Sequence, residues 1–578
     1  MSPVQGRRIA IVGAGEAGAQ LALGLQAAGH TVTLVSDRTA DDIREGQILS
    51  SQCVFGSALA VQHPLGELVD AASADVLIDG ISVHVHGTGD AWSAPLDRSA
   101  LSVDQRVKVS AWITAFADRG GDLRVQRAGV RELEALAASH DLVVVGTGKG
   151  ELSQIFATDR SRSPFDRPQR VSAVTYVRRP DDDADDRSSI RLHIVPGVGE
   201  FFTFPGLTTG GPCQMMVFEG VPGGPMDRWA DVETPEEHLA RSLELLRDNF
   251  PEEAARFEGA ELADEGAVLR GRVSPIVRHP VGVLPSGARV LGLGDAVILN
   301  DPVTGQGSNN ATIAARHLLE AIERHGGEAF DEEWMRRTFE EYWRAWAQWS
   351  TAWTNGLLGG LTPLQQSLMS RAGELPALAA AIVGGFDDPR TLFPWWTDEK
   401  NAEDFVRTKE AEERAAFDTR DLRTALGQFA TGVTVITSLT PDGKRIGVTA
   451  NSFTSVSMDP PLVLWCPGKH LMSLSHFEQA THFAINVLAS DQYALSRQFA
   501  SAASDKFQDV AVTEGIAGVP VLDGAIATFE CRTVARHDAG DHVVYIGEIE
   551  RYGYRPDAPL VFHGGAYRDT ATHRSVTA

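Results

Sequence analysis

The sequence predicts two folded parts, an α/β unit and a smaller unit made of β-strands. The first part is predicted by residues 9–38, where an apolar run, a glycine-rich turn, an Ala/Leu helix and a second β-branched run follow one another. The second is predicted by short β-type segments that alternate with turns from residue 432 onward. A chain of 578 residues is too long for one hydrophobic core, so two or three domains are expected.

The turn at residues 13–18, GAGEAG, has the spacing of a dinucleotide-binding fingerprint. Its first glycine permits a tight turn, its second lets the backbone approach a pyrophosphate, and its third lets the helix pack on the strand. The alternative is a glycine turn without a ligand. The second strand ends in Ser36 where a ribose-binding carboxylate is usual, so the fingerprint does not decide between NAD and FAD. The predicted binding residues are Gly13, Gly15, Glu16, Ala17, Gly18, Ser36, Asp37 and Arg38.

Further along, residues 41–58 indicate helix or loop, and residues 81–86 alternate as a strand that places His84 and His86 on one face. We interpret this as a solvated strand face rather than a metal site, because no carboxylate or third histidine is near in sequence. A helix is expected at 106–118. The run at 141–150 predicts a second parallel strand, with Gly146 beside the dinucleotide, and the acidic run at 181–186 predicts a solvated loop.

Residues 189–220 alternate short β-type segments with Gly and Pro, which predicts an antiparallel sheet inserted into the α/β frame. A strand at 290–293 then ends in Gly294-Asp295, and a loop with Pro302, Gly305 and Gly307 leads into a helix. The helix expected at 331–358 carries four tryptophans, three of them on one face with Phe339. An aromatic stripe is more often core than substrate wall, and we interpret it as core.

The motif DPxxGQGxNxA after a strand ending in Gly-Asp, together with the N-terminal GxGxxG, resembles the FAD-dependent aromatic monooxygenases of the p-hydroxybenzoate hydroxylase fold. The resemblance implies an FAD-binding Rossmann-like fold with an inserted antiparallel sheet. It also implies that Asp295 binds hydroxyls of FAD and that the loop faces the flavin. A helix N-terminus there would stabilise negative charge on a reduced flavin. The loop residues carried over are Pro302, Gly305, Gln306 and Gly307.

Residues 1–410 resemble more closely the epoxidase component of styrene and indole monooxygenases, through GAGEAG, VVVGTGKG, SPFDRPQR and GLGDAVILNDPVTGQG. That family takes reduced FAD from a reductase and transfers oxygen from O2 to an alkene. The resemblance implies a substrate cavity and no metal. By comparison with the two branches of the family, the cavity positions favour indole, with styrene also accepted. They are Ser50, Gln52, Val54, Ile78, Ile81 and Ala100.

Residues 397–418 are charged and helical with almost no apolar periodicity, which indicates a tether. Strands are then expected at 432–438, 448–456, 461–465, 483–488, 527–535 and 543–552, a pattern typical of a small β-barrel.

Motifs at 422–567 resemble the short-chain flavin reductases that serve two-component monooxygenases: LRTALGQFATGVTVIT, GVTANSFTSVSMDPPLVL, FAINVLASDQ and GDHVVYIGEIE. The resemblance implies a split-barrel NADH:flavin oxidoreductase domain at 419–578 that forms a homodimer. It implies that His542 faces the nicotinamide, although a structural strand histidine is the alternative. Taken alone, TANSF could be an ordinary turn. The implied flavin-binding residues are Thr449, Ala450, Asn451, Ser452, Ser455 and Lys506.

Composition excludes other functional classes. The formal net charge of -25 would repel nucleic acid and anionic membranes. No N-terminal signal pattern and no long apolar stretch occurs, so a cytoplasmic protein is expected. The four cysteines form no CxxC pair, which favours buried thiols over disulfides or zinc.

Together these observations predict a self-sufficient monooxygenase that uses FAD, NADH and O2 on a small aromatic alkene, and that could also supply a separate epoxidase component with reduced FAD. Joining the two sites by a short tether raises their effective concentration. Two alternatives stay open. NAD(P)H could reduce the N-terminal flavin directly in a single-component hydroxylase, or the C-terminal part could bind flavin without turnover.

Overall fold

The computed structural model describes residues 6–50, 52–66, 76–87, 89–148, 150–180, 189–415, 419–471, 473–501 and 505–570. Contacts divide the chain into unit 1, residues 1–414, and unit 2, residues 415–578. The acidic run at 181–186 and the last three residues of the expected tether lie outside the described residues. None of the helices in the described ranges is long and apolar enough to cross a lipid bilayer.

Unit 1 contains a six-stranded sheet whose central strands are parallel, as the apolar β-branched runs predict. Its order is β14 (Val281–Val283), β15 (Arg289–Gly292), β6 (Leu142–Val145), β1 (Arg8–Val12), β2 (Thr31–Ser36) and β5 (Asp122–Val125). Only β14 runs antiparallel to its neighbour β15. The carboxyl ends of β1, β6 and β15 meet at one edge, where all three glycine-rich loops therefore lie.

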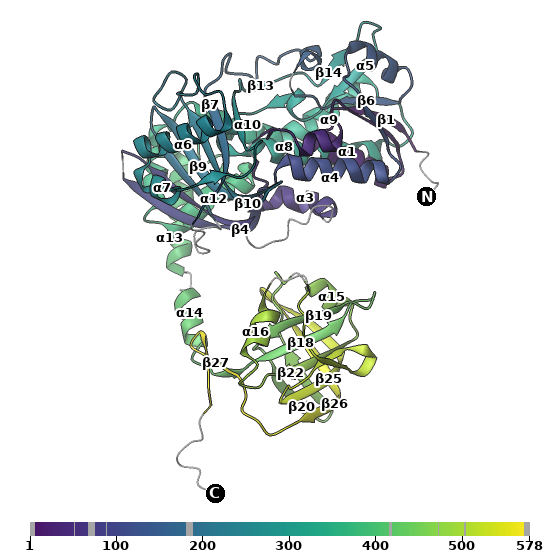
Figure 1. The fold of residues 1–578 in the computed structure, drawn as a ribbon, viewed down its shortest axis with the longest axis vertical. Helices are drawn as coiled ribbons and strands as arrows, with labels where there is room; N and C mark the ends of the chain where they lie inside the picture. The colour runs from purple at the N-terminus through teal and green to yellow at the C-terminus, as the bar shows by residue number, and fades with distance from the viewer. Residues whose placement is uncertain are drawn as a thin grey trace. The chain divides into compact units, whose positions relative to one another are not determined.

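Helices cover this sheet. Helix α1 packs against both α4 and α8, and the three lie together in Figure 1. Core residues such as Leu21, Trp112 and Leu318 belong to one buried cluster with the strands. The helices are α1 (Glu16–Ala27), α2 (Ala40–Arg44), α3 (Gly56–Gly66), α4 (Gln105–Asp118), α5 (Val130–Ala137) and α8 (Gln306–His325).

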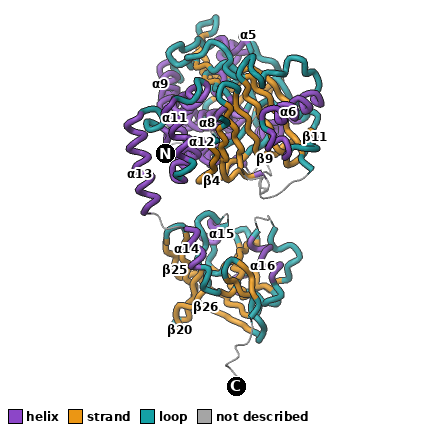
Figure 2. Tube along the Cα trace, turned by 90° about the vertical axis from the view of Figure 1, so that its left-hand side faces the viewer, coloured by secondary structure: helices purple, strands orange, loops and turns teal. Residues whose placement is uncertain are grey.

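A second sheet of eight strands is inserted into this frame. Its order is β11 (Glu261–Leu262), β7 (Val171–Arg178), β10 (Gly211–Gly220), β9 (Gly199–Thr208), β8 (Ser189–Val195), β3 (Leu77–Val85) and β4 (Asp90–Leu101), with β12 (Val268–Arg272) on β7. Figure 2 shows these strands side by side with α6 (Pro235–Asn249) against them. The sheet is not wholly antiparallel as expected, because β3 pairs with β8 in parallel. A separate antiparallel pair is formed by β13 (Ile276–Val277) and β16 (Ile298–Leu299).

His84 and His86 do not lie on a plain solvated face. The ring of His84 stacks on that of His193 from β8, with centroids 4.6 Å apart, and His86 Nε2 lies 3.1 Å from His193 Nδ1. The third histidine comes from the parallel partner strand, which sequence proximity could not reveal. Nevertheless, no group of three or more metal-ligating side chains arranged to hold an ion occurs within the described ranges.

The helix expected at 331–358, which carries four tryptophans, has a break in its helical periodicity. Helix α9 (Glu332–Tyr342) passes through a π-helical turn at Trp343–Ala347 into α10 (Gln348–Leu358). Phe339, Trp346 and Trp353 are buried, which confirms the interpretation of the stripe as core, whereas the extra residue of the π-turn leaves Trp343 half-buried.

The expected tether is a docked helix over most of its length. Helix α13 (Glu399–Ala415) buries Ala402 and Val406 in a core cluster of unit 1, and Phe405 stacks on Trp395 at 4.3 Å. Glu413 also accepts a hydrogen bond from the backbone of Ala377. These three apolar residues lie at helical spacing and anchor the helix, although its charged composition indicated a solvated tether. The other helices of unit 1 are α7 (Pro251–Arg256), α11 (Pro363–Ala372) and α12 (Pro376–Asp387).

Unit 2 is built on a seven-stranded antiparallel sheet with alternating buried residues. Its order is β19 (Arg445–Ala450), β18 (Thr434–Leu439), β22 (His482–Val487), β25 (Ala527–Ala539), β26 (His542–Tyr554), β21 (Pro461–Trp465) and β20 (Thr454–Met458). The strand expected at 448–456 is two strands, β19 and β20, separated by a turn at 451–453.

Smaller elements complete this unit. They are β17 (Thr431–Gly432), β27 (Val561–His563), β28 (Ala566–Arg568), β23 (Val512–Glu514), β24 (Pro520–Leu522), α14 (Thr419–Leu426), α15 (Leu474–Gln479) and α16 (Tyr493–Ala500).

Candidate functional site

The dinucleotide turn has the geometry that its glycines require. Gly13 has a φ of +111°, and a Cβ there would lie 2.9 Å from the backbone of Gly146. A Cβ on Gly18 would lie 1.9 Å from the carbonyl oxygen of Gly13. In contrast, a Cβ on Gly15 would meet nothing within 4 Å. The first and third glycines are therefore required by the fold, whereas Gly15 borders open space.

The residues predicted around this turn have different surroundings. Ser36 ends β2, and its hydroxyl donates to the carbonyl of Arg38 at 2.6 Å, while Asp37 is exposed. Gly146 follows β6, and its N–H bonds to the carbonyl of Val12 at 2.8 Å, which places it beside the turn. The carboxylate of Glu16 is buried, at the first position of α1.

The loop at 294–310 lies at the same edge of the sheet. Asp295 is exposed in a short 3-10 helix, η4 (Gly294–Ala296), at the carboxyl end of β15. Pro302 begins a second one, η5 (Pro302–Thr304), and Gly305 has a φ of +66° immediately before α8. A Cβ on Gly307 would meet nothing within 4 Å, so this helix start also borders open space.

Gln306 has a role that its motif did not suggest. Its side chain is fully buried and donates to the carbonyl of Phe386 at 2.9 Å, so it fastens α12 to the loop. Asn309, which lies in the motif but was not among the predicted residues, bonds to the backbones of Cys53, Phe55 and Gly305. It ties the segment at 52–55 to the start of α8.

Buried polar atoms without a hydrogen-bond partner gather at this loop. They include Asn300 Nδ2, Asp301 Oδ2, Gln306 Oε1 and Asn310 Nδ2. Buried polar groups are usually paired, so such a concentration indicates that a bound molecule or ordered water completes the site.

A small cavity of about 30 Å³ lies beside Pro302, Val303, Thr304 and Gly305. Most of its other lining residues are apolar and come from β3, β8, β9 and α12. Gln52 supplies the polar group. Its side chain is 2% exposed, and neither amide atom makes a hydrogen bond of good geometry, although the Tyr176 hydroxyl lies near enough to interact with it. The other lining residues are Cys53, Phe55, Ile81, Ile190, Leu192, Phe202, Phe204 and Phe386.

Two of the six predicted substrate residues, Gln52 and Ile81, line this cavity. Ile78 and Ala100 pair across β3 and β4 in the core, and Val54 pairs with Leu101. The Ser50 hydroxyl accepts a hydrogen bond from Gln105. The sequence analysis did not identify the aromatic and branched lining residues on β8, β9 and α12. The pattern of apolar residues in a strand or helix predicts only that such side chains are buried.

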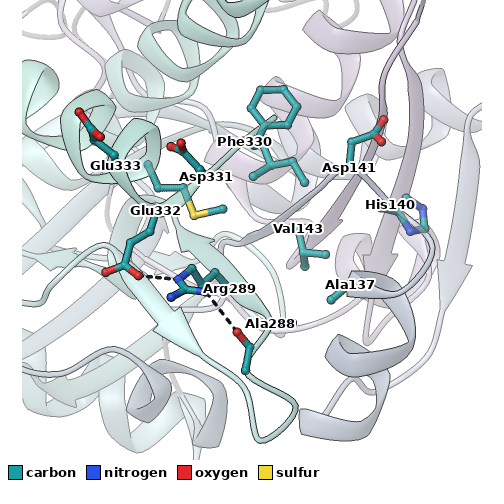
Figure 3. Close-up of a pocket in the computed structure, with 13 residues that line it drawn as sticks. Ala137, His140, Asp141, Val143, Ala288, Arg289, Phe330, Asp331, Glu332 and Glu333 are labelled. Atoms are coloured by element: carbon teal, nitrogen blue, oxygen red, sulfur yellow. Dashed lines mark hydrogen bonds and ion pairs between the residues drawn. The ribbon is translucent and has the colours of Figure 1, made fainter. Parts of the chain in front are cut away.

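Another cavity of unit 1, with a larger volume, lies elsewhere. It measures about 520 Å³ and lies at the amino ends of β6 and β15, opposite the glycine loops. Figure 3 shows His140 and Asp141 on one side and the Arg289–Glu332 ion pair on the other. Asp331 caps α9, and Asp141 accepts from the backbone of Arg8. Because its rim groups are already partnered and no predicted residue lines it, this cavity is not the candidate active site.

In unit 2 the predicted flavin residues cluster at the end of β19 and the turn into β20. Thr449 donates to the carbonyl of Ser496 at 2.6 Å, and the Ser452 hydroxyl bonds to the backbone of Cys466. Ala450 is half-buried, whereas Asn451 and Ser455 are exposed. Lys506 Nζ donates to the carbonyl of Phe499 at 3.0 Å. His542 begins β26, and its Nδ1 lies 2.8 Å from the carboxylate of Asp541.

A buried carboxyl pair lies behind the loop. Burial raises the pKa of Asp301 to about 7, and burial together with the charge of Asp301 raises the pKa of Glu219 well above its usual range. The charge of Arg170 lowers both pKa values but does not outweigh burial, because its guanidinium is bound to Glu200 through two hydrogen bonds of 2.7 and 2.8 Å.

The pair predicts a pH-dependent stability. Between the unfolded pKa of Asp, about 4, and the folded value, the native state holds a proton that the unfolded state has lost, so stability falls as pH rises. Asp301→Asn keeps the acceptor for the N–H of Val303 and removes the titration. The free energy of unfolding of Asp301→Asn, relative to that of wild type, should rise by a few kcal/mol between pH 5 and pH 8. Denaturant unfolding at each pH measures this difference. The control, Asp118→Asn, changes an exposed carboxyl. Parallel pH profiles for wild type and Asp301→Asn would contradict the assignment.

Comparisons with known proteins agree with this geometry. Residues 148–256 match the family described as "Styrene monooxygenase A putative substrate binding domain", and residues 8–86 match "NADP oxidoreductase coenzyme F420-dependent". The styrene monooxygenase StyA of Pseudomonas fluorescens is 31% identical over 376 residues, which cover 63% of this chain and 88% of that protein. The chain belongs to the styrene monooxygenase family. Unit 1 is its monooxygenase unit, and the cavity beside Pro302 lies within it.

The monooxygenase unit is joined to a flavin reductase. Residues 426–571 match "Flavin reductase like domain". The FMN reductase (NADH) SmoA of Agrobacterium fabrum is 51% identical over 148 residues, covering 26% of this chain and 84% of that protein. A solved NADH:FAD oxidoreductase of Streptomyces globisporus, SgcE6, is 36% identical over 28% of this chain and 92% of that chain, with a TM-score of 0.26. The protein is thus a self-sufficient flavin monooxygenase that uses FAD, NADH and O2.

The residues present in the monooxygenase unit fit FAD. Gly15 and Gly307 both border space that a Cβ would enter without collision, and the unpartnered polar atoms belong to residues 300–310 around the start of α8. Two helix N-termini are suited to the phosphates and to a negatively charged reduced flavin. FAD supplies the chemistry with O2 when bound, and the apolar cavity excludes water from it.

Proposed function

We propose that the reductase unit reduces FAD with NADH and that the monooxygenase unit uses reduced FAD and O2 to epoxidise small aromatic alkenes, with indole preferred and styrene also accepted. The overall reaction consumes NADH, a proton, O2 and the alkene and yields NAD⁺, water and the epoxide. FAD would bind along Gly13, Gly15, Gly18, Asp295 and the loop at 302–307, as in p-hydroxybenzoate hydroxylase-type folds.

The observation that carries this proposal is the Gln52 amide in the cavity. Walls made of Ile, Leu and Phe are chemically suited to an apolar aryl alkene, and the buried Gln52 amide suits a substrate with an N–H to satisfy. Product analysis with NADH, FAD, O2 and either indole or styrene tests it. We expect indole products that turn blue on oxidation, together with styrene oxide. Efficient styrene epoxidation without any indole product would contradict the preference.

We also propose that the reductase unit closes into a split barrel and pairs as a homodimer. Edge strand β20 and the end of β26 expose large apolar side chains, among them Met458 at 88% and Tyr554 at 81%. Exposed large apolar side chains on strands of one sheet are typical of an association surface. Sedimentation of the full chain measures the oligomeric state.

His542 would position the nicotinamide over the flavin of the reductase unit. It stands at the start of β26, half-exposed, and its Nδ1 lies 2.8 Å from the carboxylate of Asp541. His542→Ala should raise the Michaelis constant for NADH about tenfold, as expected for a lost hydrogen bond to a charged group. Epoxidation driven by chemically reduced FAD should stay as in wild type. Unchanged NADH kinetics would mean that the histidine is only structural.

A further inference from the structure

Glu16 poses an electrostatic problem for the proposed FAD site. It follows Gly15 directly in the dinucleotide turn, and its carboxylate is 4% exposed at the first position of α1. A carboxylate at a helix N-terminus is favourable by itself. A pyrophosphate held at the same N-terminus would be repelled by it, and little water is present to screen that repulsion.

Lys108 lies against this carboxylate. It comes from α4, it is 5% exposed, and its Nζ is 2.5 Å from Glu16 Oε1. Its Nζ also lies 5.4 Å from the centroid of the Trp112 ring. A lysine buried to this extent is uncommon unless an acid pairs with it.

The pair is fastened to two further helices. The amide of Gln62, on α3, donates to Glu16 Oε1 at 2.8 Å and lies 2.5 Å from the Thr312 hydroxyl on α8. The other carboxylate oxygen, Oε2, is buried and has no hydrogen-bond partner. The network is therefore incomplete within the protein, which indicates that something binds beside it.

We propose that Lys108 is a positioning residue for FAD: it cancels the charge of Glu16 and so keeps the N-terminus of α1 receptive to the pyrophosphate. This inference rests on the proposed placement of FAD at the turn. Buried ion pairs contribute little net stability compared with apolar residues of the same volume, so stability alone does not account for the pair. Removal of one partner leaves the other charge uncompensated.

The test is titration of FAD into the full chain, followed by flavin fluorescence, for four variants. Lys108→Met should weaken binding to unit 1 at least about tenfold, because the bare carboxylate then opposes the pyrophosphate. Lys108→Arg should bind within about threefold of wild type. Glu16→Gln should bind as tightly as wild type or more tightly. The double variant Glu16→Gln/Lys108→Met should return to within about threefold of wild type, because no net charge remains.

A purely structural lysine gives a different pattern. The double variant would then bind as weakly as Lys108→Met, and that result, or wild-type binding by Lys108→Met, would overturn the inference. If Lys108→Met does not fold, Glu16→Gln and the double variant still decide. The control is Arg256→Met, which removes a cation from buried Glu253 on α7 and should leave FAD affinity unchanged. If Gly15→Val binds FAD in unit 1 as tightly as wild type does, the proposed FAD site itself is wrong. If Gly15→Val loses FAD binding and Lys108→Met retains it, the proposed site stands and only this inference fails.

Discussion

Gly15→Val should abolish epoxidation while NADH oxidation by the reductase unit continues. A Cβ at Gly15 meets nothing within 4 Å, and the backbone there has a φ of -73° and a ψ of -172°, which valine adopts without strain. The fold should therefore survive. The two methyl groups would occupy the space where the pyrophosphate approaches the helix N-terminus. We expect at least a hundredfold loss of epoxide formation, on the order of 3 kcal/mol.

The measurement is epoxide formation with chemically reduced FAD, which bypasses the reductase unit. Gly271→Val is the matched control, because Gly271 also borders open space but lies on β12, away from the glycine loops. It should keep wild-type epoxidation. A Gly15→Val protein that still forms epoxide within threefold of wild type would remove FAD from this turn.

Gln52→Leu should separate the two substrates. Leucine has nearly the volume of glutamine but no acceptor, so an indole N–H would enter the apolar cavity unpaired. We expect kcat/KM for indole to fall about 10- to 100-fold, since an unsatisfied buried donor costs about 1–3 kcal/mol. Styrene has no N–H, and its kcat/KM should stay within about threefold or rise.

The control is Thr304→Val. Thr304 also lines the cavity, but its hydroxyl is already 2.6 Å from that of Thr354, so the ratio of the two substrates should not change. Competition between indole and styrene in one reaction gives that ratio directly. An equal loss for both substrates in Gln52→Leu would show that Gln52 shapes the cavity without binding the N–H.

The sequence alone determined the features that depend on local spacing. The GAGEAG turn is recognisable from the spacing of its glycines, and the structure shows that the fold requires two of them, Gly13 for its positive φ and Gly18 for the close approach of the Gly13 carbonyl. Strand and helix positions followed from the period of apolar residues, with several errors, among them the strand expected at 448–456 that is two strands. The parallel pairing of β3 with β8 and the docking of α13 each depend on a partner far away in sequence, and the π-turn after Tyr342 breaks the helical period itself.

The tertiary structure alone decided which side chains share the site. Phe202, Phe204 and Leu192 alternate on strands exactly as core residues do, and only the absence of packed atoms beside them distinguishes a cavity wall from a core. Glu16 and Lys108 are 92 residues apart, and no local pattern joins them. The physical reason is that burial, pairing and repulsion act through space, whereas propensity and turn chemistry act along the chain.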